Sequence, residues 1–230
     1  MRFFYLIFGL IIFFISCKKQ DVNEITNSPN ENKDDYSGLK VGNVSFYNVQ
    51  YIFHDDLVDR HDTTEFKMKS SIEDTFRDNA NNLRYKIHRY RWNDTIASWV
   101  DYKTLSGYIY KNYYIESEDN ISVKKLFLPY KLDFYWNSDS YNINDTLNFR
   151  YKNLYPKIKI NQFEVDSVIH IKQQYFRSFV DLKRKDEFYS KNKGLVIKTY
   201  KDLKIKKGDT TKIDRGEELY YKMYQFIKGK

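Results

Sequence analysis

The sequence predicts an all-β protein with a single antiparallel sheet, curled or half-barrel in shape, of about nine or ten strands. Three observations support this fold class. Tyr and Phe are abundant, at 22 and 17 residues, whereas Gly and Pro are scarce, at 8 and 3. Aromatic and β-branched residues gather in short segments that partly alternate between apolar and polar, as half-buried strands do. Turn-like clusters separate these segments, without the intervening helices that a parallel sheet requires.

The expected strands follow one another closely along the chain. Residues 41–53, 64–76 and 82–92 come first, separated by the turn-like segments HDDLVDRHD and RDNAN. Phe66 and Met68 stand two residues apart, which places them on one face of a strand. The remaining strands are expected at residues 98–117, 121–130, 146–153, 157–174, 193–205 and 216–228. Residues 174–189 have mixed periodicity, and we expect any short helix there.

The N-terminus has the pattern of a signal peptide. Arg2 precedes an uncharged run, Phe3–Ile15, which is too short to cross a bilayer but suits the apolar part of a signal peptide. The run is followed by Ser16 and by Cys17, the only cysteine of the chain. A small residue before a cysteine resembles the lipobox of bacterial lipoproteins, although Phe14 stands where that motif prefers Leu. The resemblance implies that Cys17 carries lipid, palmitate included, and becomes the first residue of the mature chain.

The segment after Cys17 is expected to be a flexible tether. Residues 18–38 are polar and carry too few apolar side chains to order themselves. Because Cys17 also has no second cysteine to pair with, a lipid anchor is favoured over an ordinary signal peptide with an incidental cysteine. We therefore expect a signal peptide at 1–16, lipidated Cys17 and its tether at 17–38, and one all-β domain at 39–230.

The net charge of +8 is concentrated near the C-terminus. From Lys172 onward, 17 Lys and Arg residues stand against 8 Asp and Glu residues. Such an excess suits a basic surface that faces anionic lipids or acidic glycans, or simply the solvated faces of strands. Nucleic acid is not expected as a partner of an exported, anchored protein.

The densest polar cluster lies between the first two expected strands. Imidazoles and carboxylates could bind a divalent metal there, and His54 and His61 could meet across a hairpin turn, but a solvated turn explains the same residues. His88 and His170 are expected in strands at half-buried positions. The sequence has neither a nucleophile elbow nor a glycine-rich phosphate loop, so we expect no catalytic residue, no metal and no cofactor. The cluster consists of His54, Asp55, Asp56, Asp59, His61 and Asp62.

Other residues have two interpretations each. Trp92, Trp99 and Trp136 suit either a sugar- or lipid-binding surface or packing within the sheet. The paired carboxylates are expected at solvated strand ends. Three tripeptides fit the Asp-Ser/Thr-apolar pattern that Bacteroidota use for O-glycosylation. The carboxylate pairs are Glu116/Glu118 and Glu217/Glu218, and the tripeptides are Asp94-Thr95-Ile96, Asp145-Thr146-Leu147 and Asp166-Ser167-Val168.

Three segments together resemble an uncharacterised family of Bacteroidota lipoproteins. They are FLPYKLDFYWNSDSYN at 127–142, FEVDSVIHI at 163–171 and EFYSKNKGLVIKTYKDL at 187–203. Asn192 and Lys193 replace the Gly and Val of that family, and Asn tolerates positive φ, so the turn can persist. The resemblance implies an all-β envelope lipoprotein and carries no activity. The last segment also resembles the curled-sheet periplasmic lipoprotein carriers of the Lol type, as an analogy of fold alone.

On these grounds we expect a membrane-anchored envelope lipoprotein that acts as a non-enzymatic binding or structural protein. It would lie in the outer membrane and face the periplasm or the cell surface. A lipid ligand would need an apolar concave face, whereas a glycan would need exposed Trp or Tyr rings beside Asp, Asn or Arg. The alternative is an envelope hydrolase with a metal or carboxylate site near residues 54–62. The oligomeric state is left open.

The anchor assignment predicts that Cys17→Ser releases the protein from membranes, because the acyl chains have no other point of attachment. Partition between detergent and aqueous phases measures this, and Ser16→Ala, which keeps a small residue before the cysteine, is the matched control. A Cys17→Ser variant that stays in the detergent phase would contradict the assignment.

Overall fold

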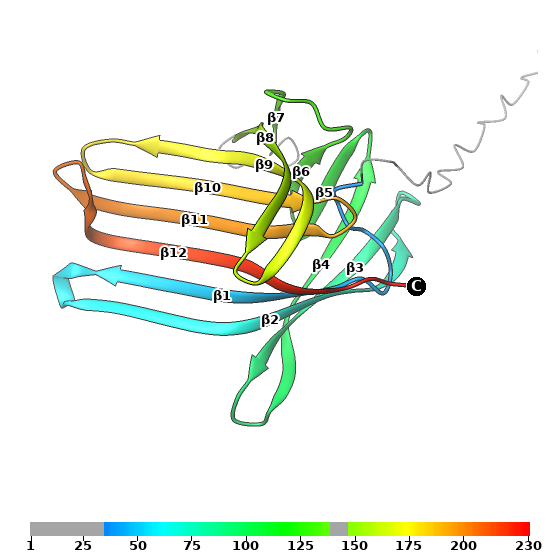
Figure 1. The fold of residues 1–230 in the computed structure, drawn as a ribbon, viewed down its shortest axis with the longest axis horizontal. Helices are drawn as coiled ribbons and strands as arrows, with labels where there is room; N and C mark the ends of the chain where they lie inside the picture. The colour runs from blue at the N-terminus through cyan, green and yellow to red at the C-terminus, as the bar shows by residue number, and fades with distance from the viewer. Residues whose placement is uncertain (1–34, 139–146) are drawn as a thin grey trace, which may run out of the picture. The chain divides into compact units, whose positions relative to one another are not determined.

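The computed structural model describes residues 35–138 and 147–230, which form one antiparallel sheet of 12 strands (Figure 1). The first half of the sheet contains β1 (Val44–Asp55), β2 (Arg60–Arg77), β3 (Leu83–Asn93), β4 (Ser98–Tyr110), β5 (Tyr113–Glu118) and β6 (Ile121–Phe127). The second half contains β7 (Tyr135–Asn137), β8 (Asn148–Ile160), β9 (Phe163–Arg177), β10 (Asp181–Ser190), β11 (Gly194–Lys206) and β12 (Asp209–Ile227).

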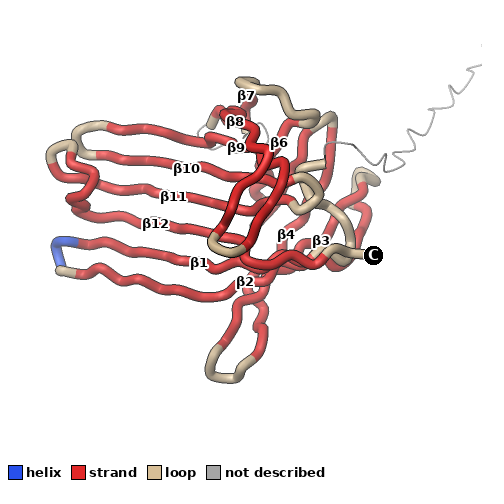
Figure 2. The backbone as a smooth tube through the Cα atoms, in the orientation of Figure 1, coloured by secondary structure: helices blue, strands red, loops and turns tan. Residues whose placement is uncertain are grey.

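The two halves are meanders, in which each strand pairs with its neighbour in the sequence. A single long pairing, β1 with β12, joins the meanders and runs from Val44 opposite Ile227 to Asp55 opposite Arg215. The edge strands of the sheet are therefore β6 and β7. Within the described ranges the sole helix is the 3-10 turn η1 (Asp56–Val58), drawn in blue in Figure 2. No helix among the described residues is long and apolar enough to span a membrane.

The edge strands β6 and β7 meet, so the sheet is nearly closed. The Lys124 N–H donates to the Ser138 carbonyl at 2.9 Å, and the Trp136 indole N–H donates to the Lys124 carbonyl at 2.8 Å. The Phe127 N–H donates to the Tyr151 hydroxyl at 3.0 Å. Strand twist accumulates over 12 strands and brings the edges together, and these bonds satisfy backbone groups that an open edge would expose.

Two hydrophobic cores hold the sheet. The first joins strands of both meanders and includes Ile87, Leu105, Leu126, Trp136 and Tyr151. The second packs the β8–β9 hairpin, which crosses in front of β10–β12 in Figure 1, against β1, β2, β11 and β12. Its buried members are Tyr47, Val49, Met68, Ile160, Val165, Val168, Val196, Tyr221 and Met223.

The segment before β1 is packed rather than free. Tyr36 and Ser37 are buried, although the sequence assigns them to the tether. The Asn43 amide donates to the Gly38 carbonyl at 2.9 Å, and the Asn43 side-chain carbonyl accepts from the Gly229 N–H at 2.9 Å. Asn43 thus fastens both ends of the described chain to one point. Cys17, the signal peptide and most of the predicted tether lie outside the described residues.

The strand count and the closure correct the prediction of a half-barrel with nine or ten strands. Two segments predicted as single strands are hairpins, because residues 98–117 turn at Lys111–Asn112 and residues 157–174 turn after Asn161. Lys111 and Asn112 have φ values of 45° and 67°, as a tight hairpin turn requires, but Lys is a weak turn signal in a sequence. The short strand β7 was not predicted.

The short helix was also predicted at the wrong place. Residues 174–189 form the end of β9, a turn and most of β10, whereas the helical turn lies in HDDLVDRHD. Asp186, Glu187, Tyr189 and Ser190 are buried at the end of β10, and the charged residues before and among them hide the strand in the sequence. The helical turn begins where the Asp55 carboxylate accepts from the Leu57 N–H at 3.2 Å.

The backbone at Gly194 predicts a stability effect. Gly194 has a φ of +79°, and a Cβ there would lie 2.8 Å from the Ser37 carbonyl oxygen. Gly194→Ala should therefore lower the free energy of unfolding by about 1–3 kcal/mol. Urea unfolding measures this, with Asn192→Gly as the control, because that change removes a side chain at a φ of 61° and should not destabilise. Equal stability of Gly194→Ala and the unmutated protein would contradict the argument.

Candidate functional site

The inner face of the curled sheet carries ion pairs instead of a continuous apolar lining. The Lys125 ammonium on β6 donates to a Glu187 carboxylate oxygen on β10 at 2.7 Å, and the Glu187 side chain is only 2% exposed. The Arg89 guanidinium on β3 lies 3.3 Å from the Glu116 carboxylate on β5. Since β6 and β10 are not neighbours in the sheet, the Lys125–Glu187 pair spans the interior.

Burial and neighbouring charges shift the pKa values of this interior cluster. Burial alone would raise the pKa of Glu187, but Lys125 and Lys198 hold it at about 2. The Tyr189 hydroxyl also donates to Glu187 at 2.6 Å. Lys198 lies directly opposite Glu187 across β10 and β11. Burial lowers the pKa of Lys198 to about 8, because its ammonium is poorly solvated there.

The interior leaves little free space. A cavity of about 50 Å³ lies beside Arg89 and is also lined by Tyr47, Tyr114, Glu116 and Tyr189. The Arg89 Nε atom is buried without a protein partner among the described residues. The cavity can hold about three or four water molecules, which would satisfy this donor, and it is far smaller than an acyl chain. The inner face therefore differs from the apolar concavity that the lipid interpretation required.

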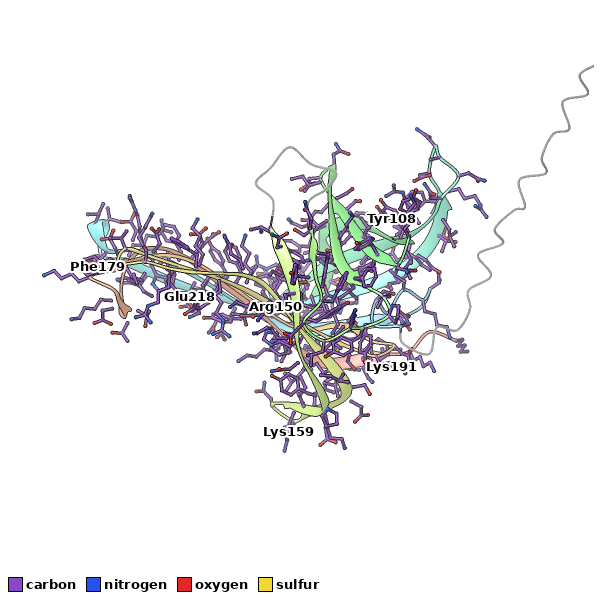
Figure 3. The ribbon with its side chains drawn as sticks, turned by 90° about the horizontal axis from the view of Figure 1, so that it is seen from above. Tyr108, Arg150, Lys159, Phe179, Lys191 and Glu218 are labelled. Atoms are coloured by element: carbon purple, nitrogen blue, oxygen red, sulfur yellow. The ribbon has the colours of Figure 1, made fainter. Side chains whose placement is uncertain are left out.

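A larger open cavity, of about 420 Å³, lies between the β3–β4 turn and the β8–β9 turn. Residues of β1, β2 and β12 line its floor, and Asn161 lines it from the end of the β8–β9 hairpin, where Figure 3 labels Lys159. We call this cavity the trough. It is lined by Asn48, Val49, Gln50, Glu65, Phe66, Lys67, Trp92, Asp94, Asn161, Tyr220 and Lys222.

Strand register gathers the polar side chains on the floor of the trough. Gln50 lies opposite Tyr220 on one side and Glu65 on the other, and directly paired residues share a face of the sheet. Asn48 stands two residues before Gln50 and therefore points to the same side. The Gln50 amide donates to the Glu65 carboxylate at 2.8 Å, which leaves other oxygens and N–H groups of both side chains directed at the open cavity.

Aromatic packing fixes the Trp92 wall. Trp92 lies opposite Trp99 across β3 and β4, and the two rings meet edge to face with centroids 5.3 Å apart. The ring centroids of Trp99 and Phe46 are 5.9 Å apart, and the Lys69 ammonium lies 5.5 Å from the Trp99 ring centroid. Trp92 is thus positioned by packing on the trough wall beside amides and carboxylates. Ring faces contact the C–H faces of sugars, and amide and carboxylate groups bond hydroxyls.

The structure brings His54 and His61 together, as the hairpin predicts. Their Nδ1 atoms are 3.2 Å apart, and the His54 Nε2–H donates to Glu218 at 3.0 Å. Lys201 also pairs with Glu218, at 2.6 Å. Asp56 pairs with a lysine as well, Lys206 of β11. Among residues 35–138 and 147–230, no group of three or more His, Cys, Asp or Glu side chains is arranged to hold a metal ion.

The remaining candidate residues are divided between packing and the surface. His170 donates to Asp186 at 2.8 Å and stacks on Phe188, whereas Trp136 is buried in the first core. The prediction that Glu116 and Glu218 lie at solvated strand ends is wrong. Glu116 forms an ion pair with Arg89, and Glu218 forms one with Lys201. Of the three glycosylation tripeptides, Asp94-Thr95-Ile96 is exposed at the β3–β4 turn, Asp166-Ser167-Val168 lies within β9, and Asp145-Thr146 falls outside the described residues.

The sequence interpretation singled out Trp92 but missed the trough floor. Asn48, Gln50 and Glu65 read as ordinary outward positions of alternating strands, and nothing in the sequence showed that two distant turns flank them. The interior pairs were missed as well, because Lys125 and Glu187 are 62 residues apart.

Comparison with known proteins gives resemblance of fold at most. Neither a family model nor a curated protein matches the chain. A "putative exported protein with YmcC-like fold" from Bacteroides fragilis has 6% identity and a TM-score of 0.43, over 81% of this chain and 97% of that one. A "putative lipoprotein" from Parabacteroides distasonis has 11% identity and a TM-score of 0.38, over 82% of this chain and 98% of that one. Likenesses this distant carry no argument about the site.

The interior ion pair predicts a pH-dependent stability. Glu187→Gln leaves Lys125 without its buried partner and should lower the free energy of unfolding by about 3–5 kcal/mol at neutral pH. The folded pKa of Glu187, about 2, lies below the ordinary value of 4.5 for a glutamate. Its contribution is therefore complete above about pH 4.5 and is lost as the pH falls towards 2.

Urea unfolding of both proteins between neutral and acidic pH measures the difference. The matched control is Glu164→Gln, which breaks a solvent-exposed pair with Lys157 and should change stability little. A difference between the unmutated protein and Glu187→Gln that stays constant down to pH 2 would show that this carboxylate is not stabilised by folding.

Proposed function

We propose that this chain is a lipid-anchored envelope protein that binds a glycan in the trough and does not transform it chemically. The observation that carries the proposal is the lining of the 420 Å³ cavity, which combines Trp92 with the polar side chains of Gln50, Glu65 and Asn161. A cavity of this volume is in the range of ligand sites, and this one is open to solvent.

The polarity of the two cavities favours a glycan over a lipid. Most residues that line the trough present amide, carboxylate or ammonium groups, which would remain unpaired against an acyl chain. The inner face is no better suited to lipid, because Lys125, Glu187 and Arg89 lie there and the free volume is about 50 Å³. Sugar hydroxyls can pair with the same groups that a lipid would leave unsatisfied.

The proposal includes a lipid anchor on Cys17 and a location in the cell envelope. Cys17 would hold the protein in the outer membrane, where the folded unit faces the periplasm or the cell surface. The envelope is rich in polysaccharides, and an anchored binding module keeps its ligand close to the membrane.

A hydrolase at residues 54–62 is less well supported. The carboxylates next to the two histidines, Glu218 and Asp56, are each paired with a lysine ammonium. These ammonium groups would repel a divalent cation and already occupy the oxygens that it needs. The arrangement serves as a network that ties β1, β11 and β12 together.

The binding proposal predicts that Trp92→Ala weakens glycan binding by about tenfold or more, because a single aromatic wall often supplies much of the affinity. The purified full-length protein in detergent would be tested on an array of bacterial polysaccharides and peptidoglycan fragments. Calorimetry on the strongest hit then gives the dissociation constants. Tyr135→Ala, which removes an aromatic ring that is 68% exposed outside the trough, is the matched control.

A second variant separates the floor from the wall. Gln50→Ala should also weaken binding, and a melting curve for each variant shows whether the fold is intact. No glycan binding, or equal binding by the unmutated protein and Trp92→Ala, would contradict the proposal. Release of shortened glycans on incubation would contradict its non-enzymatic part.

A further inference from the structure

One end of the sheet exposes apolar side chains on turns between long strands. Phe179 and Val180 form the β9–β10 turn and are 66% and 50% exposed. Figure 3 shows Phe179 at the extreme end of the β9–β12 strands. Leu57 and Val58 occupy the β1–β2 turn at the same end of the sheet and are 78% and 66% exposed. We call these four residues the apolar tip.

The β9–β10 turn has its backbone polar groups bonded internally. The Phe179 carbonyl accepts from the Gly208 N–H at 2.7 Å, and the Val180 carbonyl accepts from the Ile205 N–H at 2.9 Å. The Val180 N–H donates to the Ser178 hydroxyl at 3.2 Å. Exposed turns usually leave such groups to water, and bonding them within the protein removes most of the cost of leaving water.

The turns of this end are tied to one another. Lys206 of β11 pairs with Asp56 of the β1–β2 turn, and the Arg177 guanidinium donates to the Gly208 carbonyl at 3.0 Å. The β9–β10, β11–β12 and β1–β2 turns are therefore linked, although they belong to different hairpins. The apolar tip is a fixed feature of the sheet rather than a set of independent loops.

Basic side chains stand behind the β9–β10 and β11–β12 turns. Two carboxylates among them are paired, Asp181 with Lys204 and Asp209 with Lys212. Arg177 and Lys207 keep their charges without a carboxylate within 4 Å among the described residues. The β1–β2 turn is more acidic, because four aspartates lie in or next to it: Asp55, Asp56, Asp59 and Asp62. Phe179 and Val180 therefore have the more favourable charge around them for contact with anionic lipid.

We propose that the apolar tip inserts into the boundary between head groups and acyl chains of an anionic phospholipid bilayer. Phe179 and Val180 would enter the apolar zone, while Arg177 and Lys207 would reach the phosphates, which is the arrangement of interfacial membrane segments. The polar β11–β12 turn separates the two apolar turns, so they make no flat continuous patch of the kind that protein partners bury. A deformable bilayer can surround such separated projections. This contact adds to glycan binding and does not depend on it.

The test uses residues 33–230, which lack Cys17 and its lipid but contain all twelve strands and both cores. Cys17 is the only native cysteine, so Val180→Cys provides a single site for an environment-sensitive dye. Vesicles of phosphatidylcholine and phosphatidylglycerol should shift its emission to the blue. Leu83→Cys, at an exposed apolar position where β3 begins at the opposite end of the sheet, is the matched control and should not shift.

A sedimentation assay gives the affinity. Phe179→Ser combined with Val180→Ser should lower partition into these vesicles by about tenfold, whereas Phe76→Ser combined with Leu83→Ser should not. Vesicles of phosphatidylcholine alone, or high salt, should weaken binding if Arg177 and Lys207 contribute. Trp92→Ala should leave partition unchanged, which separates this inference from the glycan site.

Equal partition of the unmutated unit and the Phe179→Ser, Val180→Ser variant would overturn the inference, as would equal dye responses at positions 180 and 83. Light scattering without vesicles tests whether a second copy of the chain, rather than a bilayer, covers the apolar tip. A dimer that the same double variant converts to monomers would assign the tip to a second copy of the chain, and would likewise overturn the membrane assignment.

Discussion

The ion pair between Lys125 and Glu187 constrains the whole sheet. Its two partners stand on β6 and β10, which are separated by seven other strands in the order of the sheet. They can meet only if the sheet coils far enough to bring an edge back across its interior. A flatter sheet would separate the Lys125 ammonium from Glu187 and would lose the first core, which packs the two meanders together around them. The pair therefore selects the nearly closed form among the curvatures that 12 twisted strands can adopt.

Because the sheet is nearly closed, its inner and outer faces differ in the space that they leave for a ligand. Inside, ionised groups, tyrosine hydroxyls and packed apolar residues use almost all the space, so the interior stabilises the fold and has little room for a ligand. The β8–β9 hairpin folds over its own sheet and packs into the second core, whose members Tyr47 and Tyr221 also line the interior cavity. The turn at the end of this hairpin and the turn at the end of β3–β4 become walls around three bare strands. The trough is thus a by-product of how two long hairpins are packed.

The sequence revealed the fold class because alternation, aromatic content and the lack of helical segments are local properties. It did not reveal the strand count, because turns such as Lys111–Asn112 depend on positive φ values that residue types only weakly encode. It placed His54 opposite His61 correctly, since a hairpin register is also local. It could not find Glu187 as a buried residue or Gln50 as part of a site. Both depend on which distant strand arrives opposite them, and a single sequence holds no record of that.

The β1–β12 pairing has a consequence for how the chain folds as it is made. Val44 pairs with Ile227, so the first strand to be synthesised waits for the last before its edge is covered. Contacts this distant in sequence form slowly, because the entropy of closing a long loop is lost before the strands form the contacts that stabilise them. During that interval β1 offers an unpaired edge to proteases and to other nascent strands. Chaperones that cover strand edges would therefore matter more to the yield of this protein than to that of a single meander of equal size.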